Sequence, residues 1–124
     1  MKNKKNGIDC WILKLIDYEH PGKKISVKIE TDEFTCLCPW TGLPDFATVR
    51  MVYTPAGKCI ELKSLKYYLQ SFRNARIVHE SVVNRILDDL SGLCRPLDMY
   101  VECEFKVRGG IRTTVRREYR RTKE

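Results

Sequence analysis

Long apolar runs are missing from this sequence of 124 residues. No stretch approaches the ~20 consecutive apolar residues that a membrane-spanning helix needs, so we expect no membrane partner. The basic start at 1–7 is followed by a segment, 8–16, which Asp9 and Lys14 interrupt, and this is not typical of a secretory signal peptide. We therefore expect a cytoplasmic protein.

Paired metal ligands and glycine-rich motifs are also scarce. The chain has two histidines and six irregularly spaced cysteines. A structural zinc site usually has paired C-x2-4-C units, and only the C-x-C at 36–38 comes near this pattern, so we expect no metal. Without an export signal, free thiols in a reducing compartment are favoured over a disulfide scaffold. The glycines at 109–110 indicate a turn and do not match the dinucleotide fingerprint G-x-G-x-x-G.

Size and charge are the first positive observations. A length of 124 residues corresponds to one domain at ~150 residues per domain. The 23 Lys and Arg residues exceed the 16 Asp and Glu residues, for a net charge of +7, which implies an anionic partner such as nucleic acid or a phosphorylated cofactor. We expect an N-terminal leader at 1–23, a single domain at 24–118 and a basic tail at 119–124.

Hydrophobic periodicity predicts the order of the elements. Apolar residues alternate with polar ones where strands are expected, and they recur at helical spacing in the middle of the chain. The predicted elements are, in order, a strand from 24, a tight loop at 35–45, a strand at 47–53, helices at 62–72 and from 81 to before 96, and strands at 98–108 and 111–118. This order predicts an α+β fold with a β-β-α-α-β-β antiparallel sheet and two helices on one face. The other sheet face and the open edges would then meet water or other subunits.

Three clusters of residues have the composition of a site. Cys38 and Asp45 share one proline-stiffened loop, where a thiolate can act as a nucleophile and a carboxyl group can donate a proton. Lys63 and Lys66 lie in the first turns of the first predicted helix, where ammonium and backbone N–H groups can hold phosphate. The carboxylate of Glu80, which follows His79 at the start of the second predicted helix, can accept hydrogen bonds from paired N–H donors. Taken singly, an inert cysteine, solvated lysines and a helix-start acid are each the commoner explanation.

Together, and in this order, the motifs resemble one family. The segments CPWTGLPDF (38–46), ELKSLKYY (61–68), SFRN (71–74) and HE (79–80) are similar to those of the NADPH-dependent 7-cyano-7-deazaguanine reductases in their short single-domain form (QueF type I). These are nitrile reductases of queuosine biosynthesis, a tRNA modification pathway. The resemblance implies the tunnelling fold (T-fold), whose element order agrees with the periodicity. It also implies a homo-oligomeric barrel or ring, often two pentamers forming a decamer, with active sites between subunits.

The resemblance also implies a role for each matching residue. Cys38 matches the nucleophile that attacks the nitrile carbon to form a thioimide, and Asp45 matches the acid that protonates the nitrile nitrogen. The residues expected to bind the substrate 7-cyano-7-deazaguanine are Ile60, Glu61, Leu62, His79 and Glu80. The residues expected to bind the cofactor NADPH are Lys63, Lys66, Arg108 and Gly109. Leu62 stands where the family often has serine, so only its backbone is expected to contact the substrate.

Two other functions stay open. An archaeal amidinotransferase relative shares the thioimide but adds ammonia to a base already in tRNA and uses no NADPH; the intact motif at 61–66 argues against it. A basic RNA-binding module would show steeply salt-dependent binding. The aromatic motifs with which RNA-binding modules stack on bases are absent, so we expect no direct nucleic acid partner.

Overall fold

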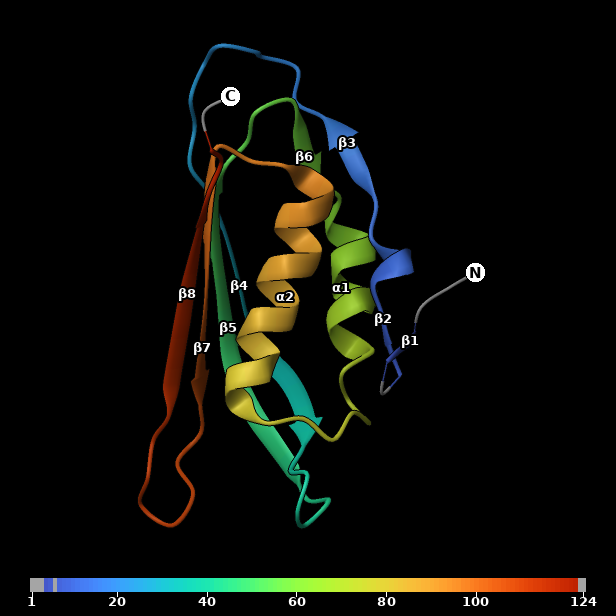
Figure 1. Cartoon of the computed structure of the whole chain (residues 1–124), viewed down its shortest axis with the longest axis vertical. Coiled ribbons are helices and arrows are strands. Elements are labelled where there is room, and N and C mark those ends of the chain that lie inside the picture. The colour runs from blue at the N-terminus through green and yellow to red at the C-terminus, as the bar shows by residue number, and fades with distance from the viewer. Residues whose placement is uncertain (1–3, 6, 123–124) are drawn as a thin grey trace.

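An antiparallel sheet with two helices on one face forms the centre of the molecule (Figure 1). The computed structural model describes residues 4–5 and 7–122. Residues 1–3 and 6 of the predicted leader and residues 123–124 of the predicted tail lie outside the described residues. The four-stranded sheet has the order β4-β5-β7-β8. Its strands are β4 (Val27–Leu37), β5 (Pro44–Thr54), β7 (Asp98–Phe105) and β8 (Thr114–Arg120). The helices are α1 (Leu62–Gln70) and α2 (His79–Cys94), so the predicted α+β fold and element order are confirmed.

The sheet has one buried and one polar face, as its alternation predicted. On β7, every second side chain is buried against the helices: Met99, Val101, Cys103 and Phe105. On the opposite face, Arg50 binds carboxylates of both neighbouring strands, with Nε 2.7 Å from Glu30 Oε2 and Nη1 3.1 Å from Glu104 Oε1. The helices leave this charged face uncovered.

Strands β4 and β5 are longer than the sequence indicated. They pair as far as Cys36 with Asp45 and Leu37 with Pro44, so the loop spans only 38–43, and the prediction of a loop over 35–45 was wrong at both ends. Pro44 is the first residue of β5, a position where the missing N–H of proline is tolerated. Between Thr31 and Phe34 the register shifts, which marks a β-bulge in β4.

The segment before β4 packs onto the domain. It contains β1 (Lys4–Lys5), β2 (Ile8–Asp9), a 3-10 helix η1 (Cys10–Ile12) and β3 (Leu15–Asp17), which pairs with β6 (Lys58–Ile60). Ile8 and Leu13 are buried in the common core. These strands are too short to show periodicity, which is why the sequence did not predict them.

Hydrogen bonds fix the two helices and link them to each other. The Glu61 side chain caps α1 by accepting from the backbone N–H groups of Lys63 and Ser64. Between the helices, the hydroxyl of buried Tyr68 donates to Asp89 Oδ2 over 2.6 Å. Helix α2 begins at His79, two residues before the predicted start. No helix in the described part of the chain is long and apolar enough to cross a membrane.

Candidate active site

The loop between β4 and β5, residues 38–43, is a tightly bonded turn. The Cys38 N–H donates to the Leu43 carbonyl over 2.9 Å, and the Gly42 N–H donates to the Cys38 carbonyl over 2.8 Å. Gly42 has φ +71, a left-handed conformation that favours glycine. Arg76 lies against the turn: its Nη1 donates to the Pro39 carbonyl over 3.2 Å, and a Cβ on Gly42 would lie 2.6 Å from its Nη2. The loop therefore holds Cys38 in a defined place.

The Cys38 thiol is set apart from the buried cysteines by its surroundings. Hydrogen bonds from the side chain and backbone of Thr41, and from the backbone of Trp40, lower its pKa, while the charge of Asp45 opposes this effect. In contrast, burial raises the pKa of Cys36 and of Cys103 to about 12. Since the thiolate is the nucleophile, the direction of these pKa shifts favours Cys38 over Cys36 and Cys103 as the reactive thiol.

Asp45 is held between two basic side chains. Its side chain is only 9% exposed; Oδ2 lies 3.2 Å from His79 Nε2, and Oδ1 lies 3.2 Å from Arg108 Nε. The His79 ring stacks on the ring of Phe105, with centroids 3.6 Å apart and planes 3° apart. Arg108 also donates to the Pro44 carbonyl. The carboxyl group, the imidazole and the guanidinium are thus fixed relative to one another.

A backbone bridge brings the start of α2 to the nucleophile loop. The Leu37 N–H donates to the Ala75 carbonyl over 2.9 Å, and the Ile77 N–H donates to the Leu37 carbonyl over 3.0 Å. This parallel bridge at the end of β4 places His79 and Glu80 beside the loop. A cavity of about 270 Å³ results, and its lining includes Cys38, Asp45, His79, Glu80 and Arg108.

The structure therefore brings together four of the predicted catalytic and substrate-binding residues. It also brings Arg108, which the resemblance placed with the cofactor, onto the carboxylate of Asp45. Gly109 is the next residue, in the exposed turn between β7 and β8, with φ +56. No motif or periodicity in the sequence pointed to Arg76, and Phe105 was predicted only as one apolar position of a strand.

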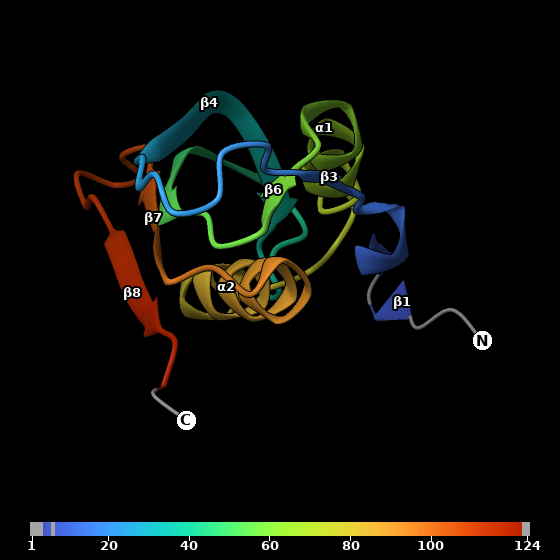
Figure 2. The same cartoon turned by 90° about the horizontal axis from the view of Figure 1, so that it is seen from above.

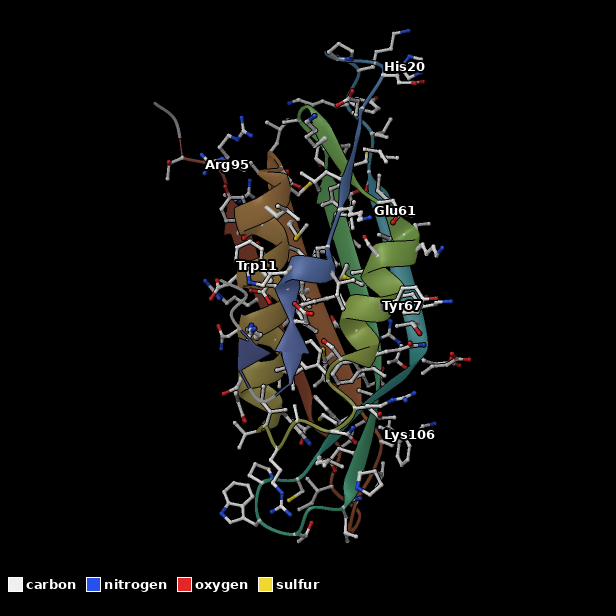
Figure 3. The ribbon with its side chains drawn as sticks, turned by 90° about the vertical axis from the view of Figure 1, so that its right-hand side faces the viewer. Trp11, His20, Glu61, Tyr67, Arg95 and Lys106 are labelled. Carbon is white, nitrogen blue, oxygen red and sulfur yellow. The ribbon has the colours of Figure 1, made fainter. Side chains whose placement is uncertain are left out.

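The remaining predicted residues lie elsewhere in the chain. None of Ile60, Glu61, Leu62, Lys63 or Lys66 lines the Cys38 cavity. Ile60 is buried and its N–H donates to the Tyr53 hydroxyl, while the Glu61 carboxylate is occupied by the helix cap, which lowers its pKa. In Figure 3, Glu61 and Lys106, which lies two residues before Arg108, are towards opposite ends of the molecule.

A second hollow, of about 400 Å³, lies between α1 and β4. Apolar side chains that include Ile29, Phe34 and Leu65 form much of its lining, and Lys66 and Arg73 add positive charge. This hollow therefore combines an apolar surface with two cations at its side. Among the described residues, no group of three or more His, Cys, Asp or Glu side chains is placed to hold a metal ion.

Comparison with known proteins identifies the family. The family model described as QueF-like protein matches residues 44–124. Proteins named NADPH-dependent 7-cyano-7-deazaguanine reductase are similar over most of the chain. The protein of Chlorobaculum tepidum is 49% identical over 113 residues, which cover 91% of this chain and 97% of its own. That of Caldicellulosiruptor bescii is 53% identical over 112 residues, covering 90% of this chain and 86% of its own.

A solved structure supports the same assignment at the level of the fold. The archaeosine synthase QueF-Like, in the apo form, superposes with a TM-score of 0.70 over 75% of this chain and 91% of its own, at 22% sequence identity. This likeness shows a shared fold, the tunnelling fold that the family resemblance implied. From the family model and these relatives, we conclude that the chain belongs to the QueF-like protein family.

Proposed function

We propose that this protein is an NADPH-dependent nitrile reductase that converts 7-cyano-7-deazaguanine to 7-aminomethyl-7-deazaguanine in queuosine biosynthesis. The observation that carries the proposal is one cavity lined by the Cys38 thiol, whose pKa is lowered, together with Asp45, His79 and Glu80. The names of the relatives support the substrate and the cofactor. The irregular spacing of the six cysteines favours free thiols, which supports a reducing, cytoplasmic location.

The first step joins the substrate to Cys38. The sulfur bonds to the nitrile carbon, one π bond of the C≡N group breaks, and its electron pair moves to nitrogen. The Asp45 carboxylate takes up the proton that the Cys38 thiol loses and delivers it to the nitrogen, so the thiol proton ends on the new C=NH group. The covalent thioimide holds the carbon in place and accepts hydride more readily than a nitrile does. When bound, NADPH supplies hydride, and two transfers with two protons give the amine and free Cys38.

Residues 79–80 hold the base during this chemistry. The Glu80 carboxylate, in the first turn of α2, accepts the paired N–H donors on the guanine-like edge. The His79 ring cannot turn freely, because it stacks on Phe105 and contacts Asp45. Arg108 and Gly109 contact the cofactor, at the side of the cavity nearest the turn between β7 and β8.

The segment 60–66 completes the site of a neighbouring copy. Ile60, Glu61 and Leu62 contact the substrate there, and Lys63 and Lys66 contact the cofactor. The separation of this segment from the Cys38 cavity within one chain supports a shared site. The two outer strands of the sheet also support ring assembly, because β4 carries acidic residues and β8 carries a row of arginines.

A mixing experiment tests the shared site. Cys38→Ala and Lys63→Ala variants are each expected to lose most of their activity. If the site is shared, mixed oligomers contain some cavities with both native halves, so activity returns when the two variants are unfolded and refolded together. No recovery in mixed oligomers of the native size would refute a shared site. Light scattering after gel filtration gives the oligomer size.

The function itself is tested with the free cyano base. Wild-type protein is expected to oxidise NADPH and, without NADPH, to form an adduct visible by intact mass. Cys38→Ala is expected to lose both, whereas Cys10→Ala, which changes a cysteine outside the cavity, keeps both. An adduct on the Cys38→Ala protein would refute the assigned nucleophile. An adduct without any NADPH oxidation would refute reduction and favour the amidinotransferase alternative.

A further inference from the structure

The tip of the nucleophile loop carries the most exposed large apolar side chain in the described part of the chain. Trp40 is 79% exposed, and Trp11, the other tryptophan, is 56% exposed. Figure 2 shows both helices beside the sheet, and in Figure 1 the loop between β4 and β5 extends past the lower ends of both helices. Neither helix therefore covers the tip. A single exposed apolar side chain is common and indicates nothing by itself, so the place of Trp40 in the cavity decides its role.

Trp40 lines the same cavity of about 270 Å³ as Cys38. The other hydrocarbon side chains of the lining are aliphatic and belong to Pro39, Ile77 and Val78. Among the described residues of the lining, Trp40 is thus the one that offers a broad apolar ring. Leu43, at the other end of the loop, is also exposed but does not line the cavity. Position, and not exposure alone, therefore distinguishes the indole of Trp40.

The backbone of Trp40 is fixed next to the nucleophile. Its hydrogen bond to the Cys38 thiol is one of those that lower the pKa of this thiol. At the preceding residue, the Pro39 carbonyl accepts a hydrogen bond from Arg76 Nη1 over 3.2 Å. The main chain at 39–40 is therefore held beside the sulfur, whereas the exposed indole can change rotamer rapidly.

The polar groups of the cavity bind the edges of a flat base but leave its faces without a partner. In the function proposed above, Cys38 bonds to the nitrile carbon and Glu80 accepts from the guanine-like edge. One face of the His79 imidazole is already occupied, because it stacks on Phe105 with ring centroids 3.6 Å apart. The faces of conjugated bases stack well on aromatic side chains. An indole two residues from the attacking sulfur is placed to cover such a face.

We infer that the indole of Trp40 stacks on the ring of bound 7-cyano-7-deazaguanine and orients it towards Cys38. The inference rests on the function proposed above and adds a substrate contact from the nucleophile loop itself. One loop then supplies both the sulfur that bonds to the nitrile carbon and the surface that fixes the plane of the ring. Fixing that plane raises the fraction of bound substrate that is ready for attack.

Calorimetry tests the contact without the covalent bond. All proteins carry Cys38→Ala, so that no thioimide contributes to the affinity for the cyano base. Adding Trp40→Leu is expected to weaken binding about tenfold or more, because the aromatic surface is lost, whereas Trp40→Phe keeps much of the affinity. The matched control is Trp11→Leu, which removes an exposed indole outside the cavity lining and is expected to change nothing.

Tryptophan fluorescence shows where the base binds. The chain has two tryptophans, so Trp11→Phe leaves Trp40 as the one indole. In the Cys38→Ala background, the cyano base should quench this emission with the dissociation constant that calorimetry gives. The reverse protein, with Trp40→Phe and native Trp11, should show no change in emission.

Steady-state kinetics with native Cys38 gives a third readout. Trp40→Leu should raise KM for the cyano base and slow adduct formation, and it should leave KM for NADPH nearly unchanged. Trp40→Phe should restore most of the rate. A loss confined to the base, and rescued by another aromatic ring, separates stacking from a general disturbance of the loop.

Four outcomes would overturn the inference. Unchanged affinity in Trp40→Leu would exclude the stacking contact, and so would Trp40 emission that a bound base leaves unchanged. Absence of base binding to the Cys38→Ala protein would mean that stacking adds no measurable affinity. A smaller oligomer in Trp40→Leu together with unchanged Trp40 emission would assign the indole to a contact between copies.

The wild-type protein separates failure of the inference from failure of the proposed function. If it forms the adduct and oxidises NADPH, any of the four outcomes refutes the inference alone. If it forms no adduct and oxidises no NADPH, the proposed function is refuted as well.

Discussion

Replacement of Gly42 by alanine should destabilise the nucleophile loop by an amount that the structure allows us to divide into two parts. The first part is conformational, because Gly42 has φ +71 and a side chain in that region costs about 1–2 kcal/mol. The second part is steric, because the new Cβ would lie 2.6 Å from Arg76 Nη2. The guanidinium is the end of a flexible side chain, so it moves away and loses its hydrogen bond to the Pro39 carbonyl, which costs about 1 kcal/mol.

The sum predicts a loss of about 2–3 kcal/mol in the free energy of unfolding, measured by urea denaturation. Two glycines give matched controls. Gly22→Ala has the same conformational cost, since φ is +87, but nothing lies within 4 Å of its Cβ; Gly57→Ala has neither cost. In an Arg76→Ala background, Gly42→Ala should cost only the conformational part.

The same variant should slow the chemistry. The Gly42 N–H bonds the carbonyl of Cys38, so a displaced turn moves the nucleophile. Adduct formation is expected to fall roughly tenfold or more, because a misplacement of about 1 Å can cost 100-fold in rate. A Gly42→Ala protein that loses no more stability than Gly22→Ala and forms the adduct at the native rate would refute the role of Arg76 and of the turn.

Three further predictions concern charge and hydrogen bonding. Alkylation of Cys38 by iodoacetamide should reach half its maximal rate at a lower pH than alkylation of an ordinary thiol, because hydrogen bonds lower the pKa of Cys38. Asp45→Asn should move this midpoint lower still, since the charge of Asp45 raises the pKa of the thiol. A wild-type midpoint above that of an ordinary thiol would contradict the role of the hydrogen bonds. Glu80→Ala should weaken binding of the cyano base, measured by calorimetry, far more than binding of NADPH; equal losses would mean that the carboxylate is misassigned. Tyr68→Phe should lower the free energy of unfolding by about 2 kcal/mol, because it removes a buried hydrogen bond to Asp89; an unchanged urea midpoint would refute that contribution.

The regular elements could be predicted from the sequence because each shows its own period. On β7 the alternation of Met99, Val101, Cys103 and Phe105 directly gives the buried face, and the fold follows from the order of such segments. The ends of β4 and β5 could not be predicted, because the pairing of Cys36 with Asp45 depends on tertiary contacts that outweigh the local signal of Pro39 and Pro44.

The candidate site could be predicted only in part, for a similar reason. Motifs gave the residue types at Cys38, Asp45, His79 and Glu80, and the structure places these four around one cavity. Their spacing along the chain carries no information on the bridge between Leu37 and 75–77 that joins them. The contact of Arg108 with Asp45 likewise depends on where the turn after β7 folds back, which periodicity does not give.

The bridge between Leu37 and the segment before α2 limits how this region of the chain can change. Because two hydrogen bonds fix Ala75 and Ile77 against Leu37, the number of residues from there to His79 is fixed as well. One residue inserted at this point would turn His79 by about 100° around the helix axis, away from its contacts. Insertions and deletions in this segment therefore cannot be accommodated.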